Sequence, residues 1–162
     1  MPHKKCKTVY FFNELSDDAK EKAREWYRDG ALDYDWYDSI YEDAERCGLK
    51  ITSFDLGNRR EITGKLTMSL EDSIKAILND HGNACDTFKL ATEYRATLDG
   101  LVQDGENDDA REALEEDYMK ALCEEYLSML DKEIEYLMAD EQVDETIIAN
   151  EYEFTEDGRR AR

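Results

Sequence analysis

The sequence predicts an α+β fold, in which a small antiparallel sheet of about four strands packs with about five to six helices, one of them long. Short β-branched, aromatic or alternating stretches lie near both ends of the chain and between residues 49 and 68. Elsewhere, apolar residues recur every three to four positions, as on one face of a helix. The longest such pattern covers residues 108–140, which therefore form the long helix.

The first elements are expected to be one strand and two helices. Residues 8–12 are mostly β-branched or aromatic and indicate a strand. Ser16 has the character of a helix N-cap, and the helix that it starts is expected to end at Gly30. A second helix is expected over about residues 33–47, because Gly48 then offers a C-terminal stop.

A hairpin and a third helix are expected in the middle of the chain. Apolar and polar residues alternate over 49–56, residues 57–60 have turn chemistry, and 62–68 return as the second strand. Ser69 with Asp72 three positions later resembles a capping box and predicts that a helix follows.

Further helices are expected over residues 85–102, 108–140 and 142–149, followed by a last strand at 152–155. A 33-residue helix would be about 50 Å long, whereas a domain of this size is about 40 Å across. The long helix must therefore overhang the domain or bend, and an overhang is compatible with a homodimer. We expect a single acidic domain over residues 1–158 and a disordered basic tail over 159–162.

The charge of the chain is very unevenly distributed. The net charge is −20, and residues 104–157 contain 21 acidic and only three basic residues. Such a field repels nucleic acids and anionic membranes and attracts basic protein surfaces. We therefore expect the partner to be a basic, nucleic-acid-binding host protein or complex, with no direct contact to nucleic acid or membrane.

The sequence has no apolar stretch long enough to span a membrane and no signal-peptide pattern at its start. Its four cysteines are 38 to 41 residues apart and form no Cys-x-x-Cys motif. Such cysteines are typical of reduced, packed thiols in the cytosol. We therefore expect the protein to act in the host-cell cytoplasm.

No catalytic or cofactor motif is present, so we expect neither an enzyme nor a cofactor. A metal site is not predicted either. His81 is close in sequence to Asp80, Cys85 and Asp86, but a zinc site needs three or four ligands in tetrahedral reach and no second ligand pair is present. The EF-hand-like start at residues 33–35 lacks the glycine needed at its sixth position.

The acidic helices are the candidate binding elements, although charged runs are usually only solvated faces. The 108–140 helix carries a net charge of −9, or one charge per about 5–6 Å, against one per about 1.7 Å in duplex DNA. A nucleic-acid mimic therefore needs a second acidic element, for which the 33–47 helix is the candidate. Three tyrosines there suit cation–π contacts with Arg and Lys. The predicted partner-binding residues are Asp35, Asp38, Glu42, Tyr34, Tyr37, Tyr41, Asp117, Glu124, Asp131 and Glu135.

Three stretches resemble a group of small acidic proteins that are widespread in phages and prophages. They are VYFFNELSDDAKEKAREWYRDG, DYDWYDSIYEDAERCGLKITSFDL and DETIIANEYEFTEDG. Members of this group are often labelled as antitoxins of stability systems. The resemblance implies a phage context, in which small acidic proteins frequently inhibit host defence by occupying nucleic-acid sites.

These observations favour a phage-type binding protein that inhibits a host nucleic-acid-binding defence enzyme, of the anti-CRISPR or anti-restriction type. Inhibition would proceed by DNA mimicry or by steric blocking, and its binding would weaken with salt. The alternative is an antitoxin that neutralises a small basic toxin around an apolar anchor formed by Trp36 and the nearby tyrosines.

Overall fold

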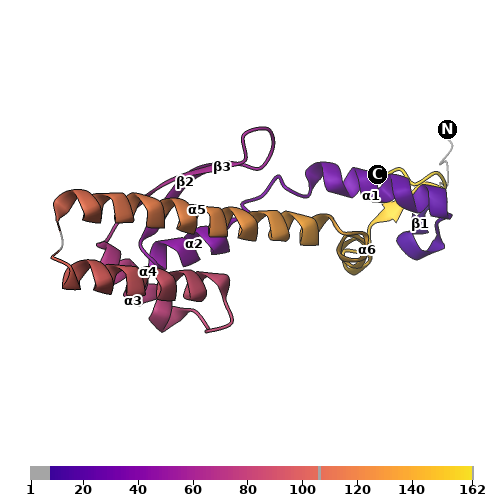
Figure 1. The fold of residues 1–162 in the computed structure, drawn as a ribbon. Coiled ribbons are helices and arrows are strands. Elements are labelled where there is room, and N and C mark those ends of the chain that lie inside the picture. The colour runs from indigo at the N-terminus through magenta and orange to yellow at the C-terminus, as the bar shows by residue number, and fades with distance from the viewer. Residues whose placement is uncertain (1–7, 106, 162) are drawn as a thin grey trace. The chain divides into compact units, whose positions relative to one another are not determined.

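A computed structural model describes residues 8–105 and 107–161 of the chain. Within these residues it contains six α-helices, one of them long, and four short strands (Figure 1). The predicted α+β class is confirmed. The four strands form two separate antiparallel pairs, β1 with β4 and β2 with β3, rather than one sheet.

The elements have the following bounds, in chain order: β1 Tyr10–Phe11, the 3-10 helix η1 Phe12–Glu14, α1 Asp17–Gly30, α2 Asp38–Arg46, β2 Leu49–Asp55, β3 Glu61–Leu66, α3 Leu70–Asp80, α4 Asp86–Gln103, α5 Asp108–Met138, α6 Asp140–Ala149 and β4 Glu153–Phe154. Both predicted serine caps are present. The Ser16 side chain accepts a hydrogen bond from the Ala19 amide, and Ser69 accepts one from the Asp72 amide.

Several predicted bounds differ from the structure by a few residues, and for two elements the reason is clear. The strand expected at 8–12 has only two residues, because the chain turns into η1 at Phe12. The helix expected from about residue 33 begins at Asp38. In the segment before it, the Asp33 and Trp36 amides donate to the Gly30 and Tyr34 carbonyls, which are turn bonds rather than bonds of an α-helix.

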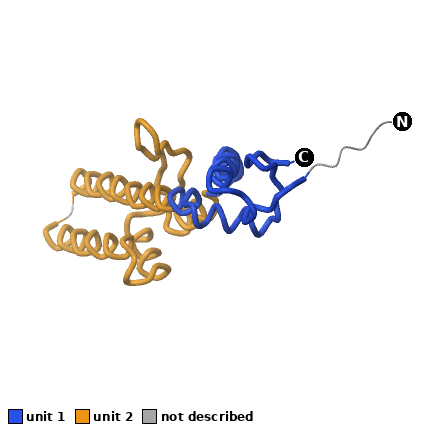
Figure 2. Tube along the Cα trace, turned by 90° about the vertical axis from the view of Figure 1, so that its right-hand side faces the viewer, with its two compact units in different colours: residues 1–36, 133–162 blue, residues 37–132 orange. Residues whose placement is uncertain are grey.

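The chain divides into two compact units, shown in Figure 2. Unit 1 is formed by the described residues within 1–36 and 133–162, and unit 2 by those within 37–132. Helix α5 belongs to both, because the division falls between residues 132 and 133. The single domain expected over residues 1–158 stays a prediction.

Unit 2 has the larger apolar core. Helices α2, α3, α4 and α5 and the β2–β3 hairpin all contribute to it. Its fully buried large side chains are Leu49, Leu70, Ile74, Ile77, Tyr118, Leu122 and Tyr126. These residues fix the side of α5 that faces inward, and hence the acidic side that faces solvent.

Unit 1 has a second core in which the two chain ends meet. Residues of η1 and α1 from the N-terminal segment pack with residues of α6 and β4: Phe12, Leu15, Ala19, Ala23, Val143, Ile147 and Phe154. The β1–β4 pairing, with Tyr10 opposite Phe154, joins the same two segments.

Residues 158–161 turn back onto β4, and the disordered basic tail expected over residues 159–162 stays a prediction. The Ala161 amide donates to the Glu153 carbonyl over 2.8 Å, and the Arg160 guanidinium donates to the same carbonyl over 2.9 Å. That guanidinium also lies 4.9 Å from the centre of the Tyr152 ring. Arg160 therefore contacts β4 and Tyr152 through a hydrogen bond and a cation–π contact, and Arg162 lies outside the described residues.

Candidate functional site

The predicted acidic binding residues do not all belong to one unit. Unit 2 contains Asp38, Glu42, Asp117, Glu124 and Asp131, and unit 1 contains Asp35 and Glu135. On α2 and in the unit 2 part of α5, Asp38, Glu42, Asp117 and Glu124 are all exposed. Four of the predicted acids are therefore exposed on the surface of unit 2.

Helices α2 and α5 contact each other inside unit 2, as the mimicry hypothesis requires of its two acidic elements. The Tyr126 hydroxyl on α5 donates a 2.8 Å hydrogen bond to the carboxylate of Asp43 on α2. The same core buries Ala44 of α2, Cys47 directly after α2, and Cys123 of α5.

An acidic patch that the sequence did not reveal lies where α4 and α5 run side by side (Figures 1 and 2). The Tyr94 hydroxyl on α4 donates to the Asp117 carboxylate on α5 over 3.0 Å. The pKa of Tyr94 is raised by burial, by this hydrogen bond, and by the negative charges of Asp117, Glu93 and Glu124. We define the acidic patch as these three carboxylates around the Tyr94 hydroxyl.

The negative charge of the acidic patch is not balanced by nearby basic side chains among the described residues. Among the residues that the structure describes, no ion pair forms to Glu93, Asp117 or Glu124. On the next position of α5, the pKa of Glu125 is raised by burial and then by the charge of Asp86 at the start of α4. Carboxylates in such a field gain energy from binding cationic groups.

An open groove of about 650 Å³ adjoins the acidic patch at Asp117. Its walls are formed by small or apolar residues of α4 and α5, among them Gly100, Leu101, Ala113 and Leu114. Arg and Lys side chains have an apolar stem and a charged head. A groove with an apolar floor and carboxylates at its end therefore fits such side chains.

Asp131 has a different environment, because it is neutralised within the protein. Arg60, in the turn between β2 and β3, binds the Asp131 carboxylate with both terminal guanidinium nitrogens. This pairing lowers the pKa of Asp131. Asp131 is therefore less suited to bind a partner than Asp117 or Glu124.

The Asp131–Arg60 pair predicts an acid-dependent change. Because the pKa of Asp131 is held below its ordinary value of 3.8, the stability that this carboxylate contributes is present above pH 3.8 and is lost as the pH falls through the folded pKa. We expect Arg60→Gln to move the pKa of Asp131 up towards its ordinary value, as measured by carboxyl NMR titration. Arg59→Gln, in the same turn, is the control. A pKa of Asp131 that does not move in R60Q would show that the pair does not form in solution.

The three predicted tyrosines have different environments. Tyr37 and Tyr41 pack against each other and against Phe54 of β2, with ring centres 4.8 to 6.1 Å apart. Tyr34 is largely exposed and belongs to unit 1. In the structure, Tyr37 and Tyr41 therefore cover the edge of the unit 2 core.

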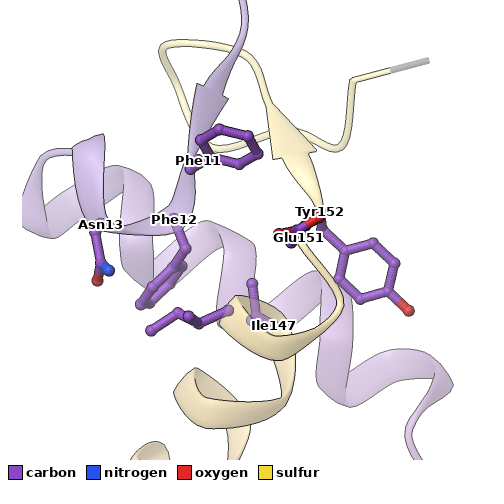
Figure 3. A pocket seen from close by; sticks show the side chains of 7 residues that line it. Phe11, Phe12, Asn13, Ile147, Glu151 and Tyr152 are labelled. Carbon is purple, nitrogen blue, oxygen red and sulfur yellow. The ribbon is translucent and has the colours of Figure 1, made fainter.

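Unit 1 carries a separate apolar pocket of about 240 Å³, shown in Figure 3. Phe11, Phe12, Ile147 and Tyr152 are among its lining residues. Phe11 is 50% exposed and Ile148, also in the lining, is 43% exposed. The pocket offers apolar contact area, with Glu151 as its one ionisable carboxylate.

A buried polar cluster lies between α2, α3 and α5 in unit 2. The Nε2 atom of His81, just after α3, is 3.3 Å from the Cys47 sulfur and 3.2 Å from the Asp43 carboxylate, both at the C-terminal part of α2. His81 Nδ1 is 2.5 Å from the Thr87 hydroxyl. His81 thus meets a cysteine that is distant in sequence, whereas Cys85, close to it in sequence, is exposed.

This cluster does not have the chemistry of a nucleophilic cysteine. Burial raises the pKa of the Cys47 thiol to about 11, whereas reactive cysteines have lowered pKa values and partial exposure. The Cys47 carbonyl and the Tyr118 hydroxyl are each 2.6 Å from the Ser73 hydroxyl, which lies in the adjoining core. Hydrogen bonds therefore hold the surroundings of the cluster in place.

The described helices include none that is both long and apolar enough to cross a membrane. Comparisons with known proteins give no relative from which a function could be transferred. No family model matches the chain, and no curated protein or solved structure is significantly similar to it.

Proposed function

We propose that this protein is an acidic binding protein of the phage type that inhibits a host nucleic-acid-binding defence enzyme, of the anti-CRISPR or anti-restriction kind. The observation that carries the proposal is the acidic patch of Glu93, Asp117 and Glu124, which the described basic side chains leave unneutralised. Its carboxylates would bind Arg and Lys residues that otherwise hold phosphates.

The surroundings of the patch support a protein partner rather than a metal ion or a small cation. The adjoining groove between α4 and α5 has apolar walls that suit the aliphatic stems of Arg and Lys. Asp38 and Glu42 on α2 are two further exposed acids of the same unit. Occupation of the partner's basic groove by this surface would prevent nucleic acid from entering it.

The proposal is tested by removing charge without changing side-chain size. We expect the variant Asp117→Asn/Glu124→Gln/Asp38→Asn/Glu42→Gln to bind the partner about tenfold or more weakly, because the acids no longer attract and pair with basic side chains. The matched control is Glu25→Gln/Asp29→Asn, two exposed acids of α1 in unit 1. The partner is first captured from bacterial lysate on immobilised protein, eluted with a salt gradient and identified by mass spectrometry.

The decisive measurement is then competition between the protein and DNA or RNA for the purified partner. The proposal expects release at moderate salt, loss of nucleic-acid binding by the partner, and rescue of that binding when the fourfold variant replaces the wild type. Capture that does not change between low and high salt, or a partner that still binds nucleic acid, would contradict it.

An antitoxin that neutralises a small basic toxin is the second candidate, and the apolar pocket of unit 1 favours it. Exposed Phe11 and Ile148 could anchor an apolar side chain of such a toxin. A complex of this kind would survive high salt and would be weakened by Phe11→Ser rather than by the fourfold charge variant. The same capture experiment therefore separates the two functions.

A further inference from the structure

Three different metal-binding side chains converge in unit 2. Asp43 and Cys47 are four residues apart, so the turn of α2 places them on the same face, and His81 reaches them from the end of α3. One donor atom from each residue lies within 4.8 Å of the other two. The convergence depends on the packing of α2 against α3, which the local sequence around His81 does not indicate.

Two of the three distances between the donors match those between ligands of one zinc ion. Typical zinc bonds to sulfur, nitrogen and oxygen in a tetrahedron place sulfur about 3.5 Å from nitrogen, and nitrogen about 3.3 Å from oxygen. In the protein the corresponding distances are 3.3 Å between Cys47 Sγ and His81 Nε2, and 3.2 Å between Nε2 and the Asp43 carboxylate. The third distance, between Cys47 Sγ and the Asp43 carboxylate, is at most 4.8 Å.

The residues that surround the donors already orient them. The Thr87 hydroxyl lies 2.5 Å from His81 Nδ1, on the side of the ring away from Asp43 and Cys47, and the Tyr126 hydroxyl donates to Asp43 Oδ2. Thr87 and Tyr126 are both fully buried. Partners that hold the second nitrogen of a histidine and the second oxygen of a carboxylate are typical of zinc sites.

We propose that Asp43, Cys47 and His81 bind a zinc ion, with a water molecule as the fourth ligand. Thiolate, imidazole and carboxylate together favour Zn²⁺ over Ca²⁺ or Mg²⁺, which prefer oxygen ligands alone. The ion binds as the Cys47 thiol releases its proton to solvent. One thiolate and one carboxylate then balance the two charges of the ion, so no net charge is buried.

The structure also indicates how an ion could enter the site and which side chain competes with it for Asp43. Cys47 is fully buried and the His81 side chain is 8% exposed, whereas Asp43 is partly exposed and gives an entry path. Arg46 binds the Asp43 carboxylate over 3.0 Å and would yield this contact to the ion, while it keeps its contact with Asp80. The bound ion would link α2 to the end of α3, so it would stabilise unit 2 independently of the acidic patch.

The test uses the full-length protein, stripped of metal under reducing conditions and titrated with CoCl2 and with ZnCl2. We expect one equivalent of Co²⁺ to give a sulfur-to-cobalt charge-transfer band and tetrahedral d–d bands, and one equivalent of Zn²⁺ to abolish them. Cys47→Ser should lose the charge-transfer band, whereas Cys123→Ser, which also replaces a buried cysteine, should keep it. Circular dichroism confirms that each variant is folded.

Thr87→Val provides a second variant that leaves all three ligands in place. Loss of the Thr87 hydroxyl should weaken zinc binding about 10- to 100-fold while the charge-transfer band persists at saturating cobalt. Absence of cobalt bands in the wild type, or a charge-transfer band that survives in C47S, would overturn the proposal. In the first case the cluster is a metal-free hydrogen-bond network.

Discussion

Gly158→Ala is expected to lower the free energy of unfolding by about 3 kcal/mol or more. Gly158 has φ +90, a conformation that residues with a side chain rarely adopt. A Cβ atom at this position would also lie 2.1 Å from the carbonyl oxygen of Ala19 in α1. The clash is not easily relieved, because the backbone of a helix cannot move aside as a flexible side chain would. Its cost therefore adds to the cost of the unfavourable backbone conformation.

Chemical denaturation followed by circular dichroism measures this change. Gly100→Ala is the matched control, since Gly100 lies inside α4 and a Cβ there would have no neighbour within 4 Å. Alanine should stabilise that helix by about 0.5–1 kcal/mol. If G158A were as stable as the wild type, the turn at residues 158–161 would not pack on α1 in solution.

Leu122→Ala is expected to cost about 2–5 kcal/mol. Leu122 is fully buried on the inner side of α5, in the core that also contains Ile74 and Tyr118. The substitution removes buried apolar atoms and leaves a cavity, while alanine itself is fully compatible with a helix. The loss therefore reports on packing rather than on helix propensity.

Thermal unfolding by calorimetry is the measurement for L122A. Val102→Ala in α4 is the control, because Val102 is an exposed apolar residue and its truncation should change stability by less than about 0.5 kcal/mol. A midpoint for L122A equal to that of V102A would mean that α5 is not packed in solution as the structure describes.

Local signals in the sequence were sufficient for most of the fold. Ser16 and Ser69 start their helices because each side chain caps a backbone amide three residues on, a relation contained in the sequence itself. Alternation likewise revealed the β2–β3 hairpin. The 33–37 segment was assigned to a helix because its apolar spacing fits one, but turn hydrogen bonds occupy its backbone instead.

The candidate sites are formed by residues that are distant in sequence. The hydrophobic periodicity of the sequence does not reveal such contacts. Glu93 and Tyr94 join Asp117 only because α4 packs beside α5. The sequence predicts Asp131 as a partner-binding residue, yet Arg60, far away in the chain, neutralises it. The residues that meet His81 in the proposed zinc site, Asp43 and Cys47, are distant from it in sequence and come from α2 and its C-cap.

Unit 1 is formed by the two ends of the chain, which affects the order in which the units can fold during synthesis on the ribosome. Residues 37–132 emerge before residues 133–162, so every segment of unit 2 is available while unit 1 still lacks α6 and β4. During that interval Phe12 and Ala23 have no partner in Val143 or Phe154 and their apolar surface is exposed. The core of unit 1 can therefore be completed only after residues 133–162 have been synthesised. We expect chaperone protection of the nascent chain to matter most for this unit.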